Sequence, residues 1–275
     1  MMDYIERKTR VITFSSGKGG VGKTFLSLNV AAALADRGHS VVLFDGDMGL
    51  ANVHVLLGMQ PQYDVSDVIA GRCTLSQTLL EGPGGIKVIP GASGKRDMAE
   101  MNMFEMTRIV QALGRLDPPP DFMLIDTGAG IGKHVTTLAR LADSIVVVVR
   151  DEPASLADAY GLIKVMNQDF RSRNFEVIIN DASSTQRGEQ VFERLQQVAM
   201  RFLGLPLVLA GVVPHEAEAM GVVRRRETLL SAAPRSAAAA VVRQIAGRFE
   251  SLRVDTESSR FLIDRLADVA AASSK

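Results

Sequence analysis

The sequence predicts an α/β protein with a doubly wound, mainly parallel sheet that carries helices on both faces. Three observations predict this fold class: strand-sized apolar runs recur along the chain, they are apolar throughout rather than alternating, and helix-sized segments separate them. Uninterrupted apolar runs are typical of strands covered on both faces. Strands that alternate with helices favour a parallel sheet, because each helix returns the chain to the same end of the sheet.

The expected elements follow one another along the chain. Strands are expected over Val11–Ser15, Val41–Phe44, Ile86–Ile89, Phe122–Ile125, Ser144–Val149, Phe175–Ile179 and Leu207–Val213. Helices are expected over Lys23–Asp36, Met103–Leu113, Ala154–Asn167 and Glu189–Phe202, with Gly38 as the stop signal after the first of them. Residues 1–250 are therefore expected to form one domain, and residues 251–275 a short polar linker and a final helix.

Composition narrows the class of protein. A chain of 275 residues is long enough for one large α/β domain with a buried core. Lysine plus arginine and aspartate plus glutamate both number 31, so global charge gives no basis for non-specific binding to nucleic acid. The single cysteine, Cys73, excludes an internal disulfide and fits a reducing, cytoplasmic compartment. Neither a secretory signal nor a membrane-spanning run is expected.

A glycine-rich loop lies between the first expected strand and the first expected helix. It reads Gly17, Lys18, Gly19, Gly20, Val21, Gly22, Lys23 and Thr24, and Phe25 follows. Glycines let several backbone N–H groups face one anion, and the helix N-terminus adds partial positive charge. We expect Lys23 to reach the β- and γ-phosphates and the Thr24 hydroxyl to ligate Mg²⁺. The alternative is a glycine-rich turn without a ligand, but the strand, loop and helix are in the order that a phosphate loop requires.

Lys18 is a second lysine that an ordinary phosphate loop does not need. With it, the loop resembles that of the deviant Walker A ATPases, the MinD/ParA family of P-loop proteins. The resemblance implies that ATP and Mg²⁺ bind here, that two subunits close over two nucleotides, and that Lys18 reaches the phosphates bound by the partner. A cation supplied in trans then acts as an arginine finger does. The alternative is an exposed lysine beside the loop.

Acidic residues follow two of the expected strands. Asp45 and Asp47 follow the second, and Asp126 ends a strand of the Walker B pattern. The carboxyl ends of parallel strands form the ligand crevice of an open sheet. The resemblance implies that Asp47 orients the attacking water, that Asp45 supports the Mg²⁺ shell, and that Asp126 holds Mg²⁺ through water. For Asp45 and Asp47, capping of the following turn is the alternative.

The resemblance also assigns residues farther along the chain. It implies a switch loop at Gly128, Ala129 and Gly130, whose N–H groups sense the γ-phosphate. It implies adenine contacts for Asn180, Pro214, His215 and Glu216, with ordinary turn chemistry as the alternative.

Two further acids and two histidines complete the site predictions. The resemblance implies acids of the dimer face at Glu152 and Asp158, with a solvated helix start as the alternative. His54 and His134 have no partner pattern and are expected at the surface.

Within the family, the sequence is most similar to the flagellar-number regulators, the FlhG/FleN branch. The segments that carry this resemblance are residues 47–58, 67–71, 82–86, 89–94, 151–155 and 158–164. It implies a homodimer with ATP, antagonism of a flagellar transcriptional activator of the FleQ/FlrA type, and action with an FlhF-type GTPase. Residues 1–10 lack the Gln-and-Arg motif with which some members activate that GTPase.

The last segment and the rival functions remain open at this stage. Arg260–Ala272 places five apolar residues on one arc, which predicts a helix that contacts a membrane peripherally, its own domain or a partner. A peripheral location at the inner membrane or cell pole is thus an alternative to a purely cytoplasmic one. Direct contact with nucleic acid is not expected, although Arg224–Arg226 is basic. The rival functions are a division-site regulator of the MinD type, a partition ATPase of the ParA type, and an antagonist for which hydrolysis hardly matters. A metabolic enzyme on the same fold, such as a synthetase, is a further rival, whereas one cysteine cannot hold the cluster of a nitrogenase-type reductase.

Overall fold

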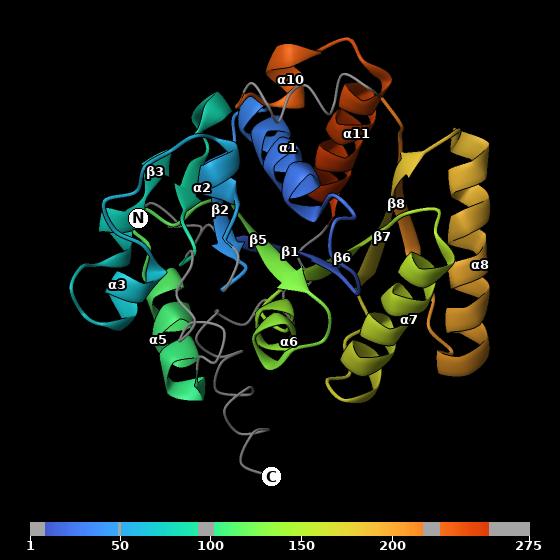
Figure 1. The fold of residues 1–275 in the computed structure, drawn as a ribbon, viewed down its shortest axis with the longest axis horizontal. Coiled ribbons are helices and arrows are strands. Elements are labelled where there is room, and N and C mark those ends of the chain that lie inside the picture. Colours follow the sequence, from blue (N-terminus) through green and yellow to red (C-terminus); the bar gives the residue numbers. More distant parts are fainter. Residues whose placement is uncertain (1–8, 49–50, 93–101, 217–225, 253–275) are drawn as a thin grey trace, which may run out of the picture.

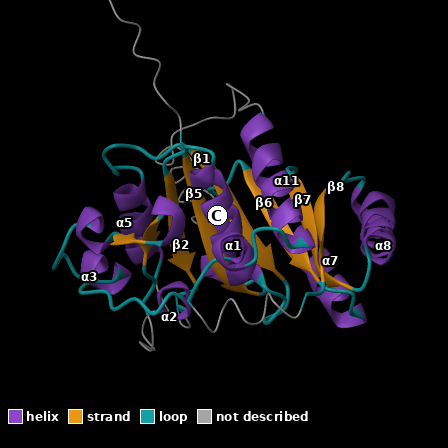
Figure 2. Cartoon of the chain, turned by 90° about the horizontal axis from the view of Figure 1, so that it is seen from above, coloured by secondary structure: helices purple, strands orange, loops and turns teal. Residues whose placement is uncertain are grey.

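The computed structural model describes residues 9–48, 51–92, 102–216 and 226–252. Within them, an eight-stranded sheet has the order β3-β4-β2-β5-β1-β6-β7-β8 and lies between two layers of helices (Figures 1 and 2). Its neighbouring strands are parallel except for β3, which is antiparallel to β4. The predicted doubly wound, mainly parallel α/β fold is confirmed.

The strands match the expected apolar runs, with the longest extensions in β5 and β7 and with one addition, β3. They are β1 (Arg10–Ser16), β2 (Val41–Gly46), β3 (Leu80–Glu81), β4 (Lys87–Ile89), β5 (Phe122–Ala129), β6 (Ser144–Val149), β7 (Phe175–Ala182) and β8 (Val208–Pro214). β5 and β7 run past their apolar runs, because backbone pairing does not depend on apolar side chains. Gly128 and Ala129, predicted in a switch loop, therefore lie in β5, where Ala129 pairs with Ser16.

The helices include short ones that the periodicity did not predict. They are α1 (Lys23–Asp36), α2 (Val53–Leu56), α3 (Val65–Ile69), α5 (Met103–Leu113), α6 (Lys133–Ala139), α7 (Pro153–Gln168), α8 (Thr185–Leu203), α10 (Leu229–Ala232) and α11 (Ala237–Ser251), with 3-10 turns η1 (Leu75–Thr78) and η2 (Pro83–Gly85). α8 begins four residues earlier than predicted, because the Ser184 hydroxyl accepts a hydrogen bond from the Arg187 N–H and caps it.

The two helix layers enclose separate parts of the core. α1 and α11 pack side by side on one face of the sheet, and α5, α6 and α7 lie on the other (Figure 1). α1 is buried around most of its circumference, with Leu26, Val30 and Leu34 all fully buried. Phe14 of β1 meets Phe249 of α11 edge to face, with ring centroids 6.5 Å apart. This packing buries the first strand and the first helix on either side of the glycine-rich loop.

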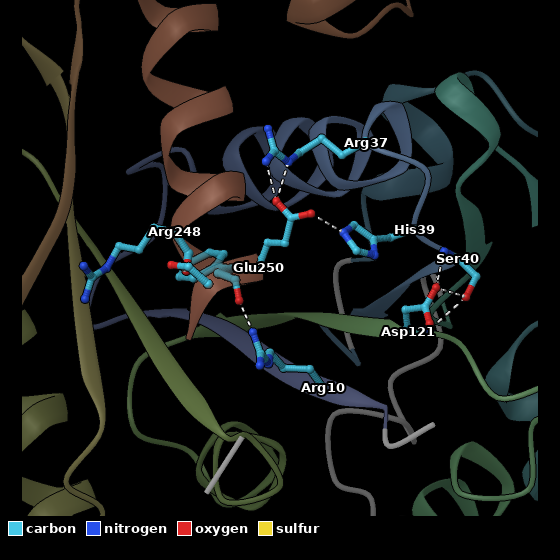
Figure 3. A network of polar contacts seen from close by, with 9 residues as sticks. Arg10, Arg37, His39, Ser40, Asp121, Arg248 and Glu250 are labelled. Atoms are coloured by element: carbon cyan, nitrogen blue, oxygen red, sulfur yellow. Dashed lines mark hydrogen bonds and ion pairs between the residues drawn. The ribbon is translucent and has the colours of Figure 1, made fainter. Parts of the chain in front are cut away.

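A polar cluster fastens the end of α11 to the amino-terminal edge of the sheet (Figure 3). The Arg10 guanidinium donates to the backbone carbonyls of Phe249 and Leu252, and so satisfies groups that a helix end leaves unpaired. Glu250 binds both Arg37 and His39, which hold the pKa of its carboxyl below the ordinary value. The cluster lies at the opposite edge of the sheet from the glycine-rich loop.

The structure corrects one prediction, and two further predictions concern residues that it does not describe. His54 is not a surface residue: it is 9% exposed, and burial lowers the pKa of its imidazole. The cause is the short helix α2, which packs its first turn into the core. The predicted helix Arg260–Ala272 lies outside the described residues, as do Arg224 and Arg225. In the described part of the chain, no helix has the length and hydropathy to cross a membrane.

Candidate nucleotide-binding site

The glycine-rich loop occupies the carboxyl edge of the sheet, between the end of β1 and the start of α1. Gly20 and Gly22 have φ angles of 76° and 97°, a left-handed conformation that glycine adopts without strain. Gly22 is also the N-cap residue of α1, so free N–H groups of the first helical turn border the loop. Lys23 is only 8% exposed at this turn. The strand, loop and helix thus have the geometry that phosphate binding requires.

Two neighbouring elements hold this loop in place. The Asn180 side-chain amide donates to the Val21 carbonyl at 2.8 Å, which ties the loop to β7. On the other side, a Cβ added to Gly17 would lie 2.2 Å from the backbone carbonyl oxygen of Asp158 in α7. The site predictions for Asn180 and Asp158 concerned adenine and the dimer face. In this structure the Asn180 amide and the Asp158 backbone border the phosphate loop.

Replacing Gly17 with alanine is expected to weaken ATP binding by roughly tenfold or more, because the methyl group forces the loop away from α7. Isothermal titration with the ATP complex of Mg²⁺ measures the effect. Gly161→Ala is the matched control, because a Cβ at Gly161 of α7 meets no atom within 4 Å. Equal affinity of both variants and the parent protein would contradict the tight fit.

Two buried aspartates meet beside the first turn of α1. β2 and β5 pair in a register that sets Asp45 directly opposite Asp126, and each residue is 1% exposed. The Thr24 hydroxyl hydrogen-bonds to the Asp126 carboxylate. Asp126 Oδ1 is buried and has no hydrogen-bond partner among the described residues. Asp45 accepts hydrogen bonds from the N–H groups of Asn52 and Val53 at 2.8 and 2.9 Å.

Burial disfavours the charged forms of the ionisable groups in this cluster. Burial raises the pKa of both Asp45 and Asp126 to about 7, and their mutual repulsion adds to the shift at Asp126. Burial also lowers the pKa of Lys23, against the opposing effects of Asp126 and Asp47. Buried carboxylates with an unpartnered oxygen fit a hard divalent cation, so the residues present fit the Mg²⁺ that the family implies. Thr24, Asp45 and Asp126 are the residues that would hold it, directly or through water.

The raised pKa values predict how stability depends on pH in the absence of nucleotide and Mg²⁺. Between pH about 4 and about 7 the folded protein binds more protons at these two groups than the unfolded chain does. Their contribution to the free energy of unfolding is therefore most favourable below pH 4 and is lost as the pH rises through about 7. Asp126→Asn is expected to flatten this dependence and to stabilise the apo protein at pH 8 by on the order of 1–3 kcal/mol.

Urea unfolding at pH 5.5 to 8 measures this effect. Asp169→Asn, at the exposed end of α7, is the control and should leave the pH dependence as it is. A destabilised Asp126→Asn protein at pH 8 would contradict the prediction.

Asp47 and the predicted switch residues lie next to one another. A Cβ on Gly128 would be 3.4 Å from Asp47 Oδ1, which places that carboxylate beside the end of β5. Gly130 has a φ of 89° and donates its N–H to the Ser16 carbonyl at 2.8 Å. Gly46 is required for the approach of β2 to β5, since its Cβ would lie 3.1 Å from the Asp126 carbonyl oxygen and 2.8 Å from a Leu138 methyl.

Lys18 binds an acid of its own subunit. Its Nζ atom lies 2.8 Å from Glu152 Oε2, at the N-cap of α7, and both side chains are about two-fifths exposed. The Lys18 ammonium lowers the pKa of the Glu152 carboxyl. The structure thus joins one residue predicted for catalysis to one predicted for the dimer face, a pairing that the sequence did not predict.

The residues predicted for adenine lie at the ends of β7 and β8. His215 Nδ1 contacts the carboxylate of Asp181, the residue that follows Asn180. Glu216 accepts from the N–H groups of Ala237 and Ala238, at 2.8 and 3.2 Å, and so caps α11. Pro214 is the last residue of β8.

Two charged residues of this edge were missed from the sequence. Asp181 and Arg150 form an ion pair there. Arg150 directly follows β6, and Asp181 lies near the end of β7, both at the carboxyl edge of the sheet. This position at the end of an apolar strand was the signal that could have identified them.

These features define a class of protein. A parallel strand that leads through a glycine-rich loop into a buried helix, with acids of the neighbouring strands beside the loop's threonine, is the arrangement of P-loop nucleoside triphosphatases. Residues 12–233 match the family model described as the CobQ/CobB/MinD/ParA nucleotide binding domain, and the chain belongs to this family.

Individual relatives agree with this assignment. The chain is 40% identical over 268 residues to the Antiactivator FleN of Pseudomonas aeruginosa, and the match covers 96% of each protein. It is 32% identical over 241 residues to the Flagellum site-determining protein YlxH of Helicobacter pylori, covering 87% of this chain and 81% of that protein. Among solved structures it is similar to a chain of the MinC:MinD cell division protein complex of Aquifex aeolicus. That match has a TM-score of 0.73 at 26% identity and covers 90% of this chain and 97% of that one.

The resemblance to the MinD/ParA ATPases, and within them to the flagellar regulators, is thereby confirmed. The roles assigned to individual site residues stay predictions, since the similarity covers whole chains and not single side chains.

Proposed function

We propose that this protein is an ATP-dependent switch between monomer and dimer that limits flagellar number by antagonising a flagellar transcriptional activator. The observation that carries the proposal is the 40% identity to an antiactivator over 96% of both chains. The short contact between Lys18 and Glu152 supports the switch, because it gives the extra lysine a defined place in the monomer.

In the proposed cycle, Lys23 and the N–H groups of the loop bind the triphosphate. Thr24, Asp45 and Asp126 would hold Mg²⁺, which would supply charge neutralisation at the β- and γ-phosphates. Asp47 orients the attacking water from its place beside Gly128. Lys18 leaves Glu152 and stabilises the negative charge that develops on the nucleotide of the partner subunit.

The binding of other partners belongs to the same proposal. The activator of the FleQ/FlrA type is the primary partner, and an FlhF-type GTPase is a second one. A peripheral membrane contact through residues 260–272 would place a cytoplasmic protein at the inner membrane or cell pole. Two such segments per dimer would bind a surface more strongly than one, so ATP would control this contact as well.

A division-site regulator is the second candidate function. The similarity to a chain of the MinC:MinD complex favours it, at 26% identity over 90% of this chain. The antiactivator shares more of the sequence with this chain, and we therefore place the flagellar function first.

Deleting the gene and counting flagella per cell by electron microscopy tests the proposal. Extra flagella, with raised transcripts of flagellar genes, are the expected result. Normal flagella together with minicells would overturn it in favour of the division-site function. A strain with the Asp47→Ala protein shows in the same images whether hydrolysis is needed in the cell.

A further inference from the structure

A line of ion pairs that ends in a histidine contact crosses the carboxyl edge of the sheet. It runs through Lys18, Glu152, Arg150, Asp181 and His215. Arg150 stands in the middle and contacts both acids: its Nη1 lies 3.7 Å from Glu152 Oε1, and its Nη2 bonds to Asp181 Oδ2. The line therefore connects the extra lysine of the phosphate loop with the residues at the ends of β7 and β8.

Arg150 is held firmly at this position. It directly follows β6, and its backbone N–H donates to the Ser155 hydroxyl at 3.0 Å. Asp181 has a φ of 61°, a left-handed conformation that aspartate adopts more readily than most residues other than glycine. Its carboxylate is bound by Arg150 on one oxygen and by His215 on the other. Asp181 thus fixes the guanidinium from the side opposite Glu152.

The arrangement makes Glu152 a shared acid. Lys18 binds one of its oxygens and Arg150 approaches the other. When Lys18 leaves, the Arg150 guanidinium remains beside the carboxylate. Without Arg150, neither of these two cations would remain beside the carboxylate once Lys18 had left. The carboxylate would then attract Lys18 more strongly than it does when Arg150 is also nearby.

We propose that Arg150 is a positioning residue that neutralises Glu152 as Lys18 departs, and so lets Lys18 reach the nucleotide of the partner subunit. This inference rests on the proposed dimer switch and adds a residue that the family resemblance did not assign. Asp181, which His215 also contacts, holds Arg150 in place near the residues predicted for adenine. Contacts between charged side chains therefore connect those residues with the phosphate loop.

The size of the effect follows from the exposure of these pairs. An exposed ion pair changes an equilibrium by a factor of roughly two to five. Each dimer releases two Lys18 side chains, so the factor is squared. Arg150→Ala is expected to raise the dissociation constant of the ATP-bound dimer by roughly four- to twenty-fivefold.

Analytical ultracentrifugation with Mg²⁺ and a non-hydrolysable ATP analogue measures this constant for the full chain. Arg187→Ala is the matched control. Arg187 binds Asp151, the residue between Arg150 and Glu152, at 2.6 and 2.9 Å, but contacts neither Glu152 nor Asp181 in any pair that the structure records. This variant should dimerise as the parent chain does. A fluorescent ATP analogue is titrated at protein concentrations below the dissociation constant of the dimer. This titration checks that the phosphate loop of each variant still binds nucleotide.

A second variant separates positioning from damage to the fold. In Arg150→Lys a cation stays beside Glu152, so dimerisation is expected to be closer to the parent level than in Arg150→Ala. An Arg150→Lys protein that dimerises as weakly as Arg150→Ala would overturn the proposal, and so would an Arg150→Ala protein that dimerises normally. A parent chain that stays monomeric with the analogue would overturn the proposed switch itself, and this inference with it.

Discussion

Replacing Lys23 with alanine is expected to abolish ATP binding, with a dissociation constant at least about 100-fold higher. Lys23 is 8% exposed at the first turn of α1, and its ammonium lies near the buried carboxylate of Asp126 and the half-buried carboxylate of Asp47. Charge-assisted bonds to phosphate are among the strongest in proteins, and their worth increases where water is excluded. Removing the lysine also removes a cation that offsets the charge of these acids, which disfavours the binding of a triphosphate.

Titration with a fluorescent ATP analogue measures this loss. Lys87→Ala, an exposed lysine at the start of β4, is the matched control and should bind as the parent chain does. Circular dichroism confirms that the Lys23→Ala protein is folded. A folded Lys23→Ala variant whose dissociation constant for ATP is within tenfold of that of the parent would show that the loop does not bind phosphate in the proposed way.

Replacing Asp47 with alanine is expected to slow ATP hydrolysis by about 10²–10⁴-fold while ATP still assembles the dimer. The magnitude is that of losing a positioned group which orients or deprotonates the attacking water. Asp47 follows β2, and its carboxylate lies beside Gly128 at the end of β5. Asp45 and Asp126, the acids that would hold Mg²⁺, lie nearby. Binding depends on the loop and on Lys23, so a slower reaction should trap the dimer rather than prevent it.

Phosphate release and light scattering after size exclusion measure the two quantities on one sample. Asp169→Ala, at the exposed C-cap of α7, is the control and should behave as the parent chain does. An Asp47→Ala protein that remains monomeric at saturating ATP would contradict the dimer switch. Unchanged hydrolysis would assign the attacking water to another residue.

Much of the fold was predictable because the chain is buried in a regular way. Strands such as Ser144–Val149 are covered on both faces, so their apolar runs are continuous and their bounds agree with the structure. Strand ends were harder, because β5 and β7 continue into Gly128–Ala129 and Asp181–Ala182, where pairing is set by the backbone. His54 was assigned wrongly because a four-residue helix gives no periodicity to read.

The sequence by itself determined the phosphate loop and the acids that accompany it. Residues 17–24 carry their own signal, since neighbouring glycines, a lysine and a threonine act together over one turn of chain. Asp45 and Asp126 were found in the same way, as acids at the ends of apolar strands. These features are local, and parallel strands bring their carboxyl ends to one edge whatever the rest of the chain does.

Only the tertiary structure decided which of these groups touch. Lys18 and Glu152 are 134 positions apart, and Arg150 and Asp181 are 31 apart. Their meeting depends on the strand order, in which β6 lies between β1 and β7, and on the register of each pair. Charges interact through space and not along the chain, so the sequence does not show which lysine meets which acid. The pairing is set only when the packing of the strands brings the two side chains within a few ångströms.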